Sequence, residues 1–82
     1  DVAALERSLA ALPGVIGVHD LHVWTLTSEM EAASAHLVTE DDADAHGVLD
    51  RARHLLQVTH GIDHATLQVE PASHTGCAEV AW

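Results

Sequence analysis

Two neighbouring runs, VIGVHDLHVWTLT at residues 15–27 and AASAHLVT at residues 32–39, carry the clearest structural signal in this chain. The first run is dominated by β-branched and large apolar residues, which is typical of a strand. The second run is rich in small residues and has Leu37 and Val38 near its end. Because the polar segment SEME at residues 28–31 separates them, we predict two strands joined by a hairpin.

Helical patterns lie on both sides of this hairpin. Residues 1–12 place apolar side chains at helical spacing, and Pro13-Gly14 follows them as a stop signal. The acidic run at residues 40–44 predicts a helix N-cap, and the helix that follows ends at His60-Gly61. Its apolar face comprises Ala45, Val48, Leu49, Ala52, Leu55, Leu56 and Thr59.

Residues 62–70 form a third predicted strand, because Ala65, Leu67 and Val69 alternate with polar residues and Pro71 follows. The order is therefore α-β-β-α-β. It predicts an α+β, ferredoxin-like sandwich in which two helices cover one face of a three-stranded sheet. We expect one domain at residues 1–71 and an irregular tail at residues 72–82. The start without Met, on a helical segment, suggests a domain taken from a longer protein.

Composition narrows the function. Three basic residues against thirteen acidic ones give a formal charge of −10, which argues against nucleic-acid partners and favours cations. Eight histidines are dispersed along 82 residues, and histidine is the commonest metal ligand. The single cysteine, Cys77, fits a reducing cytosol. No apolar run approaches the length of a membrane span, and no signal peptide is visible.

The strand patterns predict where a metal would bind. On the second strand Ala33, Ala35 and Leu37 make the better core row, which sends His36 to the opposite, uncovered face. Gln68 and Glu70 of the third strand are expected on that face. His19 lies at the entry of the first strand. We interpret His19, His36 and Glu70 as a zinc-type site. We also expect a second copy of the chain to pack against the uncovered face.

Each of the other candidate ligands also has an interpretation without metal binding. Cys77 suits zinc or cadmium as a thiolate ligand, and is equally an unpaired thiol in the tail. His74, three residues away, has the same two interpretations. His22 is either a ligand or a residue that orients a neighbour or lines a dimer cleft. A strand histidine such as His36 is, taken singly, often only a hydrogen-bonded surface residue.

Three runs closely resemble the C-terminal domain of cation diffusion facilitators, which exchange metal for protons across a membrane. They are GVHDLHVWTLT at 17–27, SAHLV at 34–38 and HATLQVEP at 64–71. The resemblance covers nearly the whole chain. It implies the same α-β-β-α-β order, a location on the cytoplasmic side of a membrane, and a V-shaped homodimer whose arms close when metal binds. The transmembrane domain would lie outside this chain, and the role would be regulatory.

The resemblance also assigns residues. His19 and His36 match the two metal-binding histidines of the family, and Glu70 matches an acidic ligand at the end of the last strand. His46 lies near a position that bridges the dimer in some members. Gln68 stands where some members have His, and this puts a fully binuclear site in doubt. His74 and Cys77 resemble extra ligands after the last strand. The metals implied are Zn²⁺, Co²⁺, Cd²⁺ or Ni²⁺.

Rival functions are less well supported. A zinc hydrolase would be expected to show HExxH or a comparable motif, and none occurs, so we predict that the chain is not an enzyme. A soluble copper chaperone needs a CxxC pair. A module that senses a metabolite between subunits would leave the histidines and HDLHVW unexplained. A stand-alone ferredoxin-like metal- or metabolite-binding module remains the alternative to a transporter domain.

Overall fold

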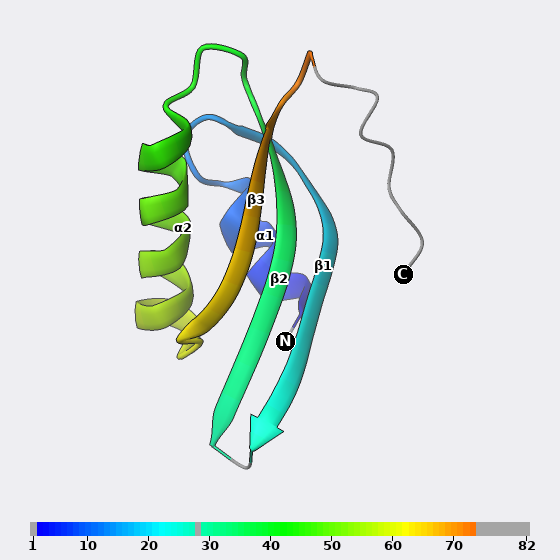
Figure 1. Cartoon of the computed structure of the whole chain (residues 1–82), viewed down its shortest axis with the longest axis vertical. Helices are drawn as coiled ribbons and strands as arrows, with labels where there is room; N and C mark the ends of the chain where they lie inside the picture. Colours follow the sequence, from blue (N-terminus) through cyan, green and yellow to red (C-terminus); the bar gives the residue numbers. More distant parts are fainter. Residues whose placement is uncertain (1, 28, 74–82) are drawn as a thin grey trace.

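The computed structural model describes residues 2–27 and 29–73, and it has the predicted α-β-β-α-β order (Figure 1). Its elements are α1 (Val2–Ala10), β1 (Val15–Thr27), β2 (Met30–Thr39), α2 (Ala45–His60) and β3 (His64–Pro71). The predicted tail lies outside the described residues from His74 onward.

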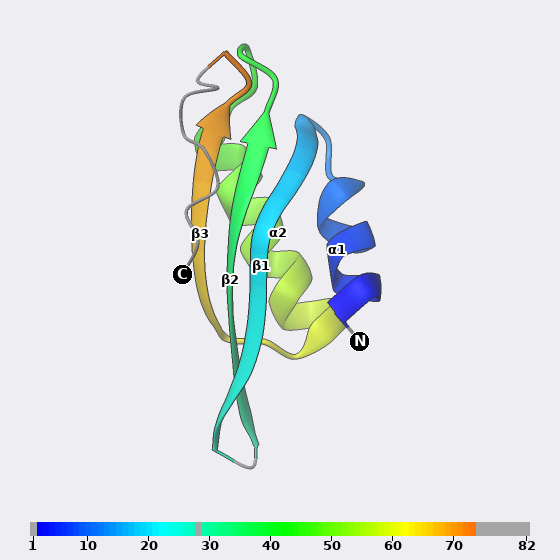
Figure 2. The same cartoon turned by 90° about the vertical axis from the view of Figure 1, so that its right-hand side faces the viewer.

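The sheet has the strand order β1-β2-β3, with β2 in the centre. β1 and β2 form an antiparallel hairpin, whereas β2 and β3 pair in parallel because α2 carries the chain back between them. Both helices lie on the same side of the sheet (Figures 1 and 2). Among the described residues no helix or strand covers the opposite side, which we call the open face.

The core lies between the sheet and the helices. Leu9, Leu37, Val48 and Leu56 are its largest fully buried side chains, contributed by α1, β2 and α2. The predicted row on β2 is confirmed: Ala33, Ala35 and Leu37 are buried, while His36 between them turns to the other face. The small alanine side chains face the helical layer, in which α1 contacts β1 and α2 contacts β3.

Several predicted boundaries and faces were wrong. α1 ends at Ala10, and β2 begins at Met30 because the hairpin connection is shorter than the predicted 28–31. Ala45 and Thr59 are exposed and not part of the α2 core face. Asp44 is the N-cap residue of α2 by position, but its side chain makes no capping hydrogen bond. Pro71 is included in β3, where an edge strand tolerates the missing N–H.

Gly61 ends α2 with a left-handed backbone at φ 68°, where its N–H bonds to the carbonyl of Gln57. A Cβ added there would meet no atom within 4 Å, so only the backbone would be strained. We expect Gly61→Ala to lower the free energy of unfolding by about 1 kcal/mol, and Gly61→Asn to lower it less because Asn tolerates this conformation. Urea unfolding measures both. Equal losses for the two variants would contradict this explanation.

Candidate metal site on the open sheet face

A β-bulge interrupts β1 in the middle of HDLH. His19 pairs with His36, and the next paired residue, His22, lies opposite Ser34. Asp20 and Leu21 therefore share a single partner position on β2. Asp20 is also the one described non-glycine residue with a positive φ, at 51°. A left-handed residue at the extra position is the backbone conformation of a G1-type bulge.

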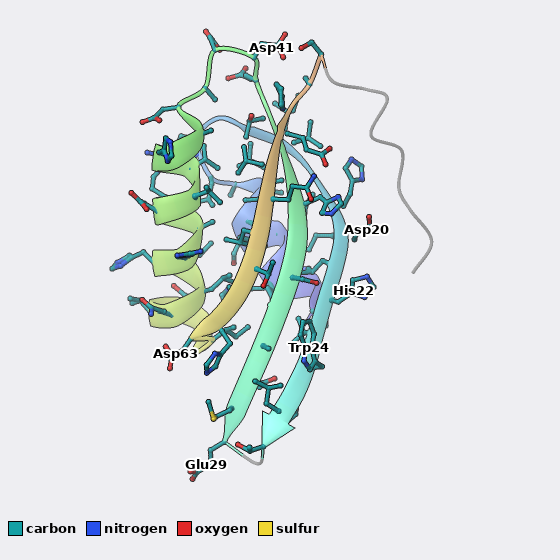
Figure 3. All side chains as sticks on the ribbon, in the orientation of Figure 1. Asp20, His22, Trp24, Glu29, Asp41 and Asp63 are labelled. Carbon is teal, nitrogen blue, oxygen red and sulfur yellow. The ribbon has the colours of Figure 1, made fainter. Side chains whose placement is uncertain are left out.

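The bulge decides which side chains share a face. In a regular strand, residues three apart point to opposite faces, so His19 and His22 would be separated. With one extra residue between them, both lie in register with β2 residues of the open face, while Leu21 packs against the core. Asp20 also points to the open face, as do His22 and Trp24 (Figure 3).

His36 lies at the centre of the polar group on this face. Its Nδ1 is 3.7 Å from Oδ2 of Asp20 and 3.6 Å from Oε1 of Glu70. All three side chains are largely withdrawn from solvent, with 23%, 16% and 10% of the His36, Asp20 and Glu70 side chains exposed. Glu70 is held from its other side, because Nε2 of Gln68 donates a 2.6 Å hydrogen bond to the same Oε1.

The strand register explains this convergence. His19, His36 and Gln68 occupy one row across β1, β2 and β3, and Glu70 lies two residues along from Gln68. The His19 ring extends over Gly17, where an added Cβ would lie 3.6 Å from its Nε2. A Cβ at Gly17 would therefore be in ordinary van der Waals contact with this ring.

The remaining predicted ligands are not part of this group. His22 is exposed on the open face opposite Ser34, beyond the bulge. His46 is exposed near the start of α2, on the helical side of the sheet. His74 and Cys77 lie outside the described residues. Sequence reasoning missed Asp20, although the apolar spacing Val18, Leu21, Val23 departs from a two-residue period and signals a bulge.

The separations around His36 are informative about chemistry. At 3.6–3.7 Å they are too long for hydrogen bonds. Two ligands bound to one tetrahedral zinc ion at 2.0–2.2 Å lie about 3.3–3.5 Å apart, so each of the two N···O separations is within a few tenths of an ångström of a ligand pair. Within residues 2–27 and 29–73, no group of three or more His, Cys, Asp or Glu side chains is already arranged as a metal site. The donor set of imidazole and carboxylate nevertheless suits a zinc-like ion.

The family model for the cytoplasmic domain of cation efflux proteins matches residues 1–72. The chain belongs to this cation efflux family. Members of this family are domains of transporters and not enzymes, which agrees with the prediction from the sequence. No helix in the described part of this efflux domain is both long enough and apolar enough to cross a membrane.

Individual relatives of this cation efflux domain are metal transporters. It is 41% identical over 73 residues to the vacuolar zinc transporter TgZnT of Toxoplasma gondii, covering 89% of this chain and 8% of that protein. It is 34% identical over 77 residues to the cadmium, cobalt and zinc/H(+)-K(+) antiporter of Bacillus subtilis, covering 90% of this chain and 24% of that protein. The chain thus spans a quarter or less of these relatives.

A solved structure supports the fold. The metal-bound C-terminal domain of the CzcD transporter from Cuprividus metallidurans has a TM-score of 0.80 and 35% sequence identity, covering 85% of this chain and 97% of that one. The predicted fold class is therefore confirmed, with a mixed three-stranded sheet and two helices. Solved structures of MamM C-terminal domains share the fold. One of them, a substitution variant, has 15% sequence identity and a TM-score of 0.72.

Proposed function

We propose that this chain is the regulatory, metal-sensing domain of a divalent cation efflux transporter, and that it binds Zn²⁺ or a similar ion on the open face. His19, His36 and Glu70 are the proposed ligands. The observation that carries this proposal is the position of His36 Nδ1, within 4 Å of two carboxylate oxygens on a sheet face that no other described element covers. Co²⁺, Cd²⁺ and Ni²⁺ suit the same donors.

Other candidate ligands lie outside the set of His19, His36 and Glu70. Cys77 or His74 of the tail would complete the shell if the tail folds over the open face. His46, on the helical side of its own sheet, would serve only a site shared with a second protomer. His22 would approach such a shared site or orient its neighbours.

The open face is also the proposed dimer surface. Trp24, 45% exposed, lies on it two residues beyond His22 (Figure 3). The formal charge of −10 per chain opposes close approach of two copies. A bound cation would offset part of this repulsion and shift the population toward a closed homodimer. In the full transporter, closure would be passed to the membrane domain that precedes this chain.

A zinc titration of the metal-free chain by calorimetry tests the proposal. We expect submicromolar to micromolar binding of zinc by the wild type. In His36→Ala we expect the affinity to fall at least about 10-fold. Loss of a residue that only supports a ligand typically lowers metal affinity about 10–100-fold, and loss of a ligand itself should cost no less. His54→Ala is the matched control, since His54 is exposed on α2, on the other side of the sheet.

The outcomes are distinct. Wild-type affinity in His54→Ala together with a loss in His36→Ala supports a sensor site on the sheet face. Undiminished binding in His36→Ala would move the site to the tail or the helix histidines, and absence of binding in the wild type would leave only a dimerisation domain. Distances between spin labels on the two protomers, measured with and without zinc, then test closure.

A further inference from the structure

We propose that Asp20 is a direct ligand of the metal ion, so that the open face of one protomer supplies Asp20 in addition to His19, His36 and Glu70, without help from the tail. This inference rests on the proposed function and deepens it. Its starting point is Oδ2 of Asp20, the one buried side-chain polar atom among the described residues that has no hydrogen-bond partner. A buried carboxylate oxygen without a partner is unfavourable, and a cation is the partner that satisfies it best.

The backbone does not by itself require a charge at this position. Asp20 adopts the left-handed conformation of the bulge at φ 51°, which Asn adopts at least as readily as Asp. A neutral amide would therefore build the same bulge without leaving a buried charged oxygen unpaired. The carboxylate needs a second reason, and its direction toward His36 provides one.

The same ring nitrogen faces both carboxylates. If Asp20 only oriented His36 as an acceptor for an Nδ1–H group, that nitrogen would be a donor and the metal would bind the far nitrogen, Nε2. The 3.7 Å separation is too long for such a hydrogen bond. Oε1 of Glu70 lies 3.6 Å from the same atom, so two carboxylate oxygens face one ring nitrogen. This arrangement favours a shared ion over an orienting contact.

The Asp20 side chain is positioned by the paired strands of the sheet. It follows His19 directly, and it is brought to the site by a bulge between paired residues of β1 and β2. Gln68, from β3, fixes Glu70 on the other side of His36. Each of the three strands thus contributes to the site.

Asp20→Asn is the decisive variant, because it keeps the shape and the preferred backbone while removing the charge. In zinc titrations of the chain we expect at least about a 10-fold loss of affinity. With Co²⁺ as the probe, the visible absorption spectrum of the bound ion should change, which a purely orienting role would not produce. Asp63→Asn, an exposed residue before β3, is the control and should bind zinc as the wild type does.

The metal-free variant provides a second readout. If the Asp20 carboxylate has no partner without metal, Asp20→Asn should unfold at the same temperature as the wild type or higher. A lower unfolding temperature without metal would show a structural partner and overturn the inference. Zinc affinity within about twofold of wild type in Asp20→Asn, with affinity lost in His36→Ala, would also overturn it while the proposed function stood. Unchanged binding in His36→Ala would instead overturn the proposed function.

Discussion

The Leu37→Ala variant is expected to lose about 2–5 kcal/mol of its free energy of unfolding. Leu37 is fully buried near the C-terminal end of β2, between Val18 of β1 and Val69 of β3. Truncating a buried leucine costs about 2–5 kcal/mol because it removes apolar contacts and leaves a cavity. Small domains have stabilities toward the lower end of about 5–15 kcal/mol, so this loss removes much of the total.

Circular dichroism during heating and urea titration would measure the loss, at one fixed protein concentration because a dimer couples stability to concentration. Val58→Ala is the control. Val58 is 68% exposed on α2, and its truncation should change the free energy of unfolding by no more than about 0.5 kcal/mol. A Leu37→Ala protein as stable as Val58→Ala would mean that β2 is not the centre of the core.

Zinc is expected to raise the unfolding temperature of the metal-free chain by more than about 10 °C. A ligand that binds only the folded state at 100 times its dissociation constant adds about 2.7 kcal/mol of stability. In a domain of this size each kcal/mol moves the midpoint by about 4–8 °C. The proposed ligands come from three different strands, and unfolding separates them, so the unfolded chain should bind zinc more weakly.

Scanning calorimetry after chelator treatment measures this shift. His36→Ala should show little of it, and magnesium in place of zinc should have little effect because Mg²⁺ prefers six oxygen ligands. An equal zinc-induced rise in the wild type and in His36→Ala would contradict a site centred on His36. The same comparison in Asp20→Asn gives an independent estimate of the contribution of that carboxylate.

Much of this architecture could be predicted because local pattern and packing agree. Alternation along a strand sets its two faces, so His36 and Glu70 were assigned to the open face from Ala33, Ala35 and Leu37 and from the pattern of β3. Helical spacing and stop signals located α1 and α2 within a few residues. The excess of histidines and acidic residues indicated metal chemistry before any geometry was known.

The site around His36 depends on contacts between residues far apart in the chain. The parallel pairing of β2 with β3 places His36 beside Gln68, and the bulge in β1 turns Asp20 toward the same ring. Alternation specifies which face a side chain occupies, but not which residue of a neighbouring strand lies opposite it. That register depends on how the helices pack on the sheet. Sequence therefore determined the elements, their faces and the class of ligand, whereas tertiary structure decided that Asp20 and Glu70 meet at one nitrogen of His36.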